Sequence, residues 1–469
     1  MNEGLSVFRK LTAEQREARL LRCGLHAAMT PAGRAILGEP EVSRSGVKAE
    51  YTYSSEQKRT THRQRYRISV FNLEVIQLQA LGTGQAMGKE RNFVGQQTAA
   101  DQPVLSPIVT DGDGLWNAAG GFGAGEVGQR GNSPASRRGT AGLLRGTAIR
   151  ALYGLGLDSG EVHLAAMGER HYVVEDVLPL HHTPGQPLPG LYQAASQALA
   201  LALAQEQPGR PGLLMGMDPE FLLLRESSGR VVPASRFLPL DGVAGCDAGP
   251  PGTQGVFPVA ELRPAPRGEP RALLAQLMSA ARTADRLVAD RSLRWRAGGM
   301  PLPGWALGGH LHFSGVTLTA PLLRALDNYL ALPLMLLEDA RAAARRPRYG
   351  VLGDFRIQPH GGFEYRTLPS FLVSPVIAKG AVFLAHLIVS RYEDLTLRPL
   401  DREDLHAAYF SGNKTPLRPA FIPLQAQLRS LRGYAQAAPY IEPLLHYIAA
   451  ERTWDEARDI RGLWRNKET

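Results

Sequence analysis

A recurring placement of charged residues within apolar segments constrains the fold of this chain more than any other feature. The clearest case lies in residues 349–375, where a Gly-Gly pair at 361–362 predicts a turn and FEYRT at 363–367 predicts a strand. Side chains alternate between the two faces of a strand, so Glu364 and Arg366 project together while the aromatic residues face the core. One such pair alone is typical of a solvated sheet face, where ion pairs stabilise little.

The same alternation recurs along the second half of the chain. Apolar strands are predicted near residues 213–224, 259–264 and 307–314, and amphipathic segments predict helices at about 269–291 and 319–345. The residues that share a strand face are Asp218 and Glu220, Glu261 and Arg263, His310 with His312 and Ser314, Asp354 and Arg356, and Glu364 and Arg366. A solvated face would mix in lysine, threonine and glutamine, whereas these positions are almost wholly acids, histidines and arginines.

These residue types together predict metal-assisted chemistry on an anionic substrate. Carboxylates suit hard divalent cations such as Mg²⁺ or Mn²⁺, and histidine favours Mn²⁺ or Zn²⁺. Arginine binds phosphate and carboxylate oxygens through two parallel hydrogen bonds.

Length, charge and cysteine content are compatible with several classes of protein. The 469 residues fit one large α+β domain with an extension as well as two domains. The net charge of +9 comes mostly from dispersed arginines, so it is a weak indication of a nucleic-acid partner. Cys23 and Cys246 cannot form a disulfide framework, and the first residues lack the apolar core of a signal peptide. We therefore expect a cytoplasmic protein without a membrane span.

Local signals divide the chain into three predicted regions. Residues 1–81 contain a capping-box pattern at Thr12, which predicts a helix to about Met29, followed by strand-like segments. Residues 82–146 are rich in glycine and polar residues and predict a linker or mobile insertion. Residues 147–469 form the predicted main domain.

Five motifs in this main domain carry a family resemblance. They are DPEF at Asp218, AELRP at Ala260, GGHLHFS at Gly308, LGDFR at Leu352 and GGFEYRTLPSFL at Gly361. In this order they resemble the phage-type carboxylate-amine ligases, amidoligases with the catalytic fold of glutamine synthetase and glutamate-cysteine ligase. The resemblance spans about residues 213–395. It implies an α+β fold with a curved antiparallel sheet, helices packed outside it, and ATP on the concave face.

The resemblance also implies roles for the paired residues, with ATP and Mg²⁺ or Mn²⁺ as cofactors. The implied metal ligands are Asp218, Glu220, Glu261, His310 and Glu364. The implied nucleotide contacts are His312 and Ser314. The implied catalytic residues are Glu364 and the arginines Arg263, Arg356 and Arg366, with Arg366 contacting phosphate or substrate. The segment around residue 261 has one clear acid, so the number of metal ions stays open.

The implied reaction transfers the ATP γ-phosphoryl group to a carboxylate and lets an amine attack the acyl phosphate. The partners are then ATP, a carboxylate and an amine, either of which is a small molecule, a peptide or a protein. Glutamine synthetase relatives often form rings, so a homo-oligomer is compatible with the resemblance.

Two other readings of the residues stay open. A metal hydrolase would use His310 and His312 as zinc ligands and Glu220 or Glu364 as base. A structural or nucleic-acid-binding protein would use the positive charge, although the sequence has no helix-turn-helix signal.

Overall fold

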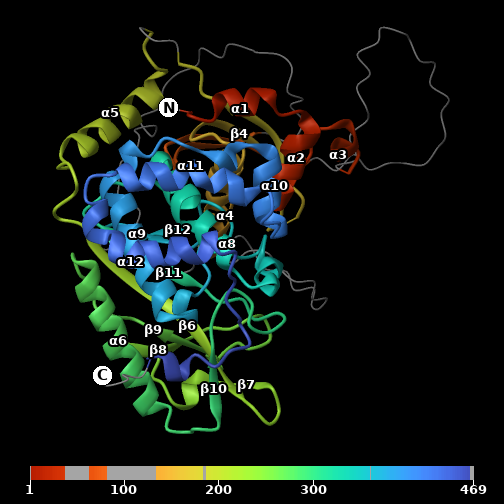
Figure 1. Cartoon of the computed structure of the whole chain (residues 1–469). Helices are drawn as coiled ribbons and strands as arrows, with labels where there is room; N and C mark the ends of the chain where they lie inside the picture. Colours follow the sequence, from red (N-terminus) through yellow and green to blue (C-terminus); the bar gives the residue numbers. More distant parts are fainter. Residues whose placement is uncertain are drawn as a thin grey trace, which may run out of the picture.

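Two sheets with helices packed on them make up the molecule (Figure 1). The computed structural model describes residues 2–36, 63–81, 134–168, 170–182, 186–359 and 361–464. The larger sheet is antiparallel throughout, and helices and strands are mixed along the chain. This architecture confirms the predicted α+β class.

The larger sheet contains the segments in which charged residues recur. Its strand order is β12-β13-β11-β6-β9-β8, and β10 and β7 also pair with β6. The strands are β6 (Leu214–Arg225), β7 (Arg230–Val232), β8 (Ala244–Asp247), β9 (Val259–Leu262), β10 (Leu293–Arg296), β11 (Gly309–Ser314), β12 (Phe355–Ile357) and β13 (Phe363–Tyr365). Strands that are far apart in sequence, such as β6 and β11, therefore become direct neighbours.

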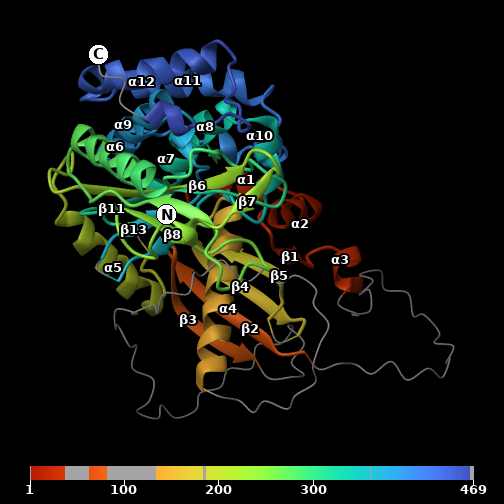
Figure 2. The same ribbon diagram turned by 90° about the horizontal axis from the view of Figure 1, so that it is seen from below.

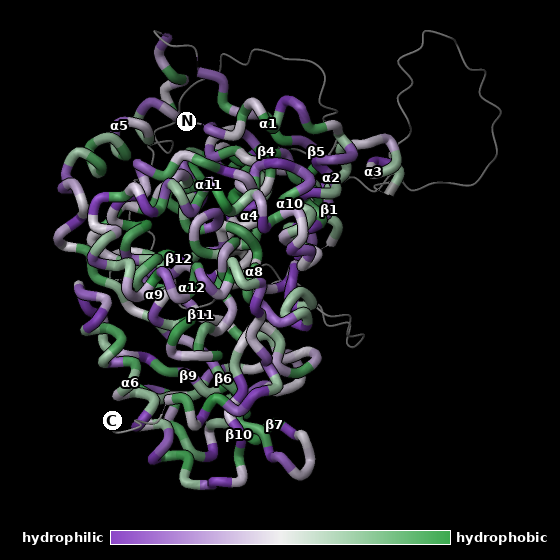
Figure 3. The backbone as a smooth tube through the Cα atoms, viewed as in Figure 1, coloured by the Kyte–Doolittle hydropathy of each residue, from purple (hydrophilic) through white to green (hydrophobic). Residues whose placement is uncertain are grey.

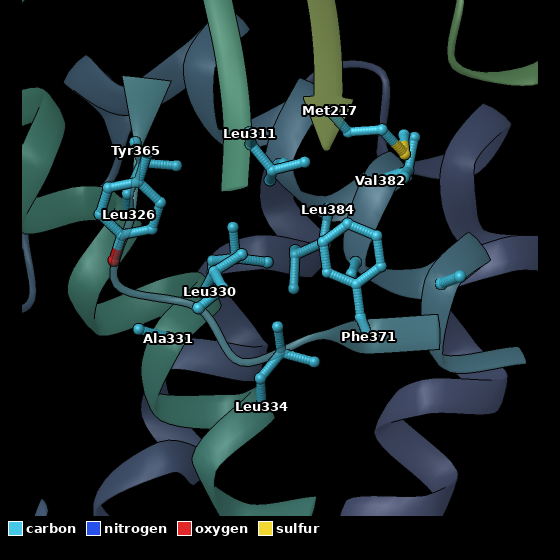
Figure 4. Close-up of a cluster of buried hydrophobic side chains, with 14 of the residues drawn as sticks. Met217, Leu311, Leu326, Leu330, Ala331, Leu334, Tyr365, Phe371, Val382 and Leu384 are labelled. Atoms are coloured by element: carbon cyan, nitrogen blue, oxygen red, sulfur yellow. The ribbon is translucent and has the colours of Figure 1, made fainter. Parts of the chain in front are cut away.

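One face of this sheet is apolar and packs on helices. Met217, Leu311 and Tyr365 come from three adjacent strands and contact the helical side chains Leu330 and Leu384 in a common core (Figure 4). The predicted inward orientation of the aromatic residues in β13 is confirmed, since neither is exposed. The opposite face of the same strands carries the charged side chains.

The helices form successive layers on the apolar side of the sheet. Figure 2 shows α8 and α9 between the sheet and the outer pair α11 and α12. The α-helices of this region are α6 (Pro270–Leu287), α7 (Ala320–Leu326), α8 (Leu332–Leu337), α9 (Pro375–Arg391), α10 (Glu403–Ser411), α11 (Leu417–Ser430) and α12 (Tyr434–Ala449). The helix predicted at 319–345 is thus several pieces, because the π-helix η2 (Asp327–Ala331) joins α7 to α8 and a 3₁₀-helix follows.

The other helices of this region are short 3₁₀ turns. They are η1 (Ala234–Arg236), η3 (Ala340–Arg345), η4 (Phe371–Val373), η5 (Tyr392–Asp394), η6 (Pro399–Asp401) and η7 (Arg461–Trp464). Within the described residues, two helical segments, Ala320–Leu337 and Pro375–Asp394, are long and apolar enough to cross a membrane, but 94% and 72% of their residues are buried inside the protein. They are core helices of this domain, and the buried segment around α8 is coloured hydrophobic in Figure 3.

The N-terminal unit is built on the second sheet, of order β1-β5-β4-β2-β3. Its elements are α1 (Leu5–Lys10), α2 (Ala13–Arg22), β1 (His26–Ala27), α3 (Pro31–Ile36), β2 (Arg65–Phe71), β3 (Glu74–Leu81), α4 (Pro134–Gly154), β4 (Ser159–Ala166) and β5 (Tyr172–Pro179), followed by α5 (Gly190–Ala204). The capping box at Thr12 is present, but α2 ends at Arg22 and not near Met29, because Gly24, with a φ of +76°, closes the helix before β1 begins.

The sheet pairing bears on the predicted division of the chain. Strand β2 pairs with β4 along its whole length, so residues 65–81 and 159–179 belong to one sheet. Helix α4 begins at Pro134, and residues 82–133 of the predicted linker lie outside the described residues. A boundary at residue 147 would cut through α4 and separate β4 from β2, so we propose that the N-terminal unit folds with α4 and both hairpins.

Candidate active site

Three neighbouring strands bring the predicted charged residues to one place on the polar face of the larger sheet. The register sets His310 of β11 opposite Asp218 of β6. On the other side of β11, His312 lies opposite Glu364 of β13. Antiparallel pairing puts directly opposed side chains within contact distance, so residues from three distant motifs form one cluster.

Asp218 is at the centre of this cluster. His312 Nε2 lies 2.9 Å from Asp218 Oδ2, and His310 Nδ1 lies 3.1 Å from Asp218 Oδ1. His310 Nδ1 is also 3.4 Å from Glu364 Oε1. One ligand atom each from Asp218, His312 and Glu364 lie within 4.8 Å of one another. This spacing allows the three side chains to contact a single small ligand or ion.

Arginines surround the buried carboxylate of Glu364, whose side chain is 3% exposed. Arg366 Nε is 3.3 Å from Glu364 Oε1, and Arg356 Nη1 is 3.4 Å from Glu364 Oε2. Gln358 Nε2 also donates a hydrogen bond of 2.9 Å to Glu364 Oε2. The predictions missed Gln358, because a lone glutamine beyond the strand carries no charge signal in the sequence.

A second group of acids lies on the next strand pair. Glu220 of β6 is opposite Glu261 of β9, and Glu261 accepts a hydrogen bond from Arg263. The carboxylate of Glu220 accepts the N–H of Gly308 at 2.7 Å, which ties it to the residues just before β11. Ser314 is at the far end of β11, opposite Leu214, on the face shared by the two histidines.

The charges of the cluster shift the pKa values of its members. Burial alone would raise the pKa of Asp218, but the charges of His310 and His312 outweigh it and hold that pKa well below its ordinary value. Burial would lower the pKa of His310, yet the Asp218 carboxylate raises it. Burial raises the pKa of Glu220 to about 7, and burial together with the charge of Asp218 raises that of Glu261.

Sequence comparison identifies the family of this domain. Residues 215–466 match the protein family described as phage phiEco32-like COOH.NH2 ligase-type 2. The chain belongs to this family of carboxylate-amine ligases. The matched segment contains all of the paired residues described above.

Distant structural similarities to solved proteins include the following three. A bifunctional glutathione synthetase from Pasteurella multocida is 10% identical over 57% of this chain and 50% of that protein, with a TM-score of 0.35. A glutamine synthase homolog is 15% identical over 60% of this chain and 79% of its own, with a TM-score of 0.26. Apo GmaS is 13% identical over 61% and 79%, with a TM-score of 0.29. This chain therefore spans about half the length of the glutathione synthetase. A comparison of this chain with curated proteins finds no match.

The donor atoms of this COOH-NH₂ ligase family member fit a divalent cation. Carboxylate oxygens with one imidazole are a ligand set that Mg²⁺ and Mn²⁺ accept. Asp218 Oδ1 is buried and makes no hydrogen bond of good geometry, although it touches His310. Among the described residues this oxygen has no other partner, so it keeps a lone pair that could ligate a cation.

The same geometry disfavours a zinc site with two histidines. Among the residues that the structure describes, the group that could hold an ion contains His312 but not His310. His310 Nδ1 instead lies 3.1 Å from Asp218 and 3.4 Å from Glu364, so it contacts two carboxylates of the cluster.

Proposed function

We propose that this COOH-NH₂ ligase is ATP-dependent and forms an amide bond through an acyl phosphate. The proposal rests mainly on the convergence of Asp218, His312 and Glu364 beside Arg356 and Arg366. Acids that could hold a cation and arginines that could hold phosphate oxygens are thus within one cluster. Phosphoryl transfer needs these two functions together.

In the proposed first step, a carboxylate oxygen of the substrate attacks the γ-phosphorus of ATP. A new O–P bond forms, the bond to the β-phosphate oxygen breaks, and ADP leaves. The amine then attacks the acyl carbon, phosphate leaves with its bonding electrons, and the amine nitrogen loses a proton. The products are an amide, ADP and phosphate, so no covalent bond to the protein is needed.

The side chains of the cluster would position and stabilise these groups. Arg356 and Arg366 would bind the transferring phosphoryl group, where planar guanidinium groups match phosphate oxygens. Asp218, His312 and Glu364, with Glu220 and Glu261 beside them, would hold Mg²⁺ or Mn²⁺. Such an ion, when bound, neutralises the charge of the phosphates.

The proposed roles of the other residues follow from their positions. Arg263 would reach substrate from the Glu261 side of the sheet, and His310 would support Asp218 and Glu364 as their cationic partner. Ser314, at the end of β11, would contact the nucleotide. We propose a cytoplasmic enzyme, because ATP and reduced cysteines are both characteristic of that compartment.

Calorimetry with ATP tests the proposal. We expect ATP to bind when Mg²⁺ or Mn²⁺ is present and not in a chelator, and Asp218→Asn to weaken this binding. Measurement of ADP release across pairs of carboxylates and amines, with mass spectrometry of the products, would then identify the substrates. Equal binding of ATP in chelator would refute the metal-dependent site, and turnover without nucleotide would favour a hydrolase.

A further inference from the structure

A buried acid lies behind the active site, on the helical side of the sheet. Asp327 is the first residue of the π-helix η2 and is 3% exposed, within an otherwise largely apolar run of core residues. An ionisable group in such surroundings is costly unless it is fully hydrogen-bonded. Single π-helical turns inside α-helices are also frequent at functional positions.

Asp327 accepts three hydrogen bonds that come from different segments. Its Oδ1 accepts the hydroxyl of Tyr365 at 2.7 Å and the N–H of Gly353 at 3.0 Å. Its Oδ2 accepts the hydroxyl of Tyr153 at 2.7 Å. Both carboxylate oxygens are therefore engaged, which offsets the cost of burying this acid.

Two of these donors belong to the segments that carry the active-site residues. Tyr365 lies between Glu364 and Arg366, and its buried ring points away from the cluster, on the core face of β13. Gly353 is three residues before Arg356 on the adjoining segment. A single carboxylate thus fixes the spacing between the segments 353–357 and 363–367.

The two segments are also joined directly to each other. The N–H of Arg366 donates to the carbonyl of Asp354 at 2.8 Å. The N–H of Asp354 in turn donates to Thr367 Oγ1 at 3.3 Å. Displacement of Asp327 would therefore move both segments together.

The third donor, Tyr153, comes from the N-terminal unit. It lies on α4, outside the segment 215–466 that matches the ligase family. Gly353 has a φ of +68°, and a Cβ atom there would lie 2.2 Å from the Tyr153 ring. Glycine at this position therefore allows Tyr153 to approach the backbone closely enough to reach Asp327.

A small cavity beside Asp327 does not offer a ligand site of its own. It is also lined by Arg19 and Arg324. Arg19 donates to three backbone carbonyls, and Arg324 donates to the carbonyl of Leu157 at 2.9 Å. Because these guanidinium groups are engaged within the protein, the contacts here serve to join the N-terminal unit to the ligase domain.

We propose that Tyr153 and Asp327 are positioning residues of the active site, through which the N-terminal unit holds Glu364 and the two arginines in place. Neither residue touches the cluster, so both act through Tyr365 and Gly353. The effect on metal binding rests on the proposed function, whereas the effect on the backbone of the two segments does not.

The test compares two tyrosine variants of the full-length protein. Tyr153→Phe removes the hydroxyl that contacts Asp327. Tyr192→Phe is the matched control, because it also removes a buried hydroxyl, which donates to the carbonyl of Gly160 at 3.0 Å, but has no contact with Asp327. Hydrogen exchange of the amides of Gly353 and Arg366, Mn²⁺ calorimetry and the electron paramagnetic resonance spectrum of added Mn²⁺ are measured for each.

We expect Tyr153→Phe to speed exchange of these two amides, to weaken Mn²⁺ binding by up to about tenfold and to change the Mn²⁺ spectrum. Tenfold is the lower end of the loss for a direct partner of a metal ligand, and Tyr153 acts on the ligands only through Asp327 and Tyr365. Tyr192→Phe should change none of these, even if it melts at a lower temperature. Unchanged exchange in Tyr153→Phe, or equal changes in both variants, would overturn the inference. If wild-type protein binds no Mn²⁺, the proposed metal site is wrong, and the exchange measurement still decides the positioning role.

Discussion

Replacement of Glu364 by glutamine distinguishes a structural ion pair from a catalytic residue. Glutamine has nearly the same shape and can still accept the hydrogen bond from Gln358. It removes the negative charge that lies within 3.4 Å of His310, Arg356 and Arg366. The variant therefore tests the charge of Glu364 with little change in packing.

The surroundings of Glu364 set the expected loss of stability. Breaking a fully buried ion pair costs about 3–5 kcal/mol, whereas an exposed pair is worth about 1 kcal/mol or less. Glu364 is buried but Arg356 is 33% exposed, so solvent screens part of the interaction. We expect the free energy of unfolding to fall by about 2 kcal/mol, between these two limits. Arg356 and Arg366 both lie beside Glu364, so removal of its negative charge is expected to destabilise the folded protein.

The expected loss of function is larger. Removing one charged ligand from a low-dielectric site should lower turnover by roughly two or more orders of magnitude. Mn²⁺ affinity should fall by about tenfold or more, as measured by calorimetry. Melting temperature and ADP release are measured on the same samples, so that loss of folded protein is not mistaken for loss of catalysis.

A second buried glutamate provides the matched control for this experiment. Glu338 is 2.9 Å from Arg346, both side chains are at most 3% exposed, and neither belongs to the cluster. Glu338→Gln should therefore lower the melting temperature while Mn²⁺ and ATP binding stay as in the wild type. Full activity and unchanged Mn²⁺ binding in Glu364→Gln would refute the catalytic role. Glu364 would then be a residue of a structural ion pair only.

Two further predictions concern pH and the N-terminal unit. In metal-free protein, the free energy of unfolding should fall as pH rises from 4.5 to about 7. The reason is that burial raises the pKa of Glu220 to about 7, so folded Glu220 keeps a proton that the unfolded chain releases. In denaturant titrations, Glu220→Gln should reduce this dependence of stability on pH. A chain that begins at Thr147 lacks Ile68 and Val70, both at most 1% exposed in the N-terminal core, so it should melt at a lower temperature than the full chain or aggregate. A free energy of unfolding that stays constant over this pH range would contradict the first expectation. A shortened chain as stable as the full one would contradict the second.

The alternation of side chains explains why much of the site was predictable from sequence. A strand has two faces, so aromatic residues at 363 and 365 determine where Glu364 must point once they are buried. The same reasoning placed His310 and His312 on one face of β11. The alternation of side chains does not predict which strands pair with each other. The contacts of Asp218 with both histidines depend on the pairing of β6 with β11, about ninety residues apart.

Contacts between residues that are distant in the chain give little signal in the local sequence. The predicted boundary at residue 147 depends on local composition, which gives no information on the pairing of β2 with β4. The predicted end of α2 near Met29 is too late for a different reason, because Gly24 has a φ of +76° and the N–H of Leu25 donates to the carbonyl of Leu20, which closes the helix locally. Local signals such as the capping box at Thr12 were reliable because all of their atoms lie within one turn.

Asp327 shows that a sequence can contain a signal whose meaning needs the fold. It interrupts a long apolar run, and a charge within such a run predicts a buried, hydrogen-bonded group. The sequence does not reveal that its donors are Tyr153, Gly353 and Tyr365, which lie up to about 170 residues away. The candidate site includes residues on the short strands β12 and β13, and three-residue strands have few hydrogen bonds of their own to hold such residues in place. The buried network supplies that support, and it does so with a residue from outside the family-matched domain.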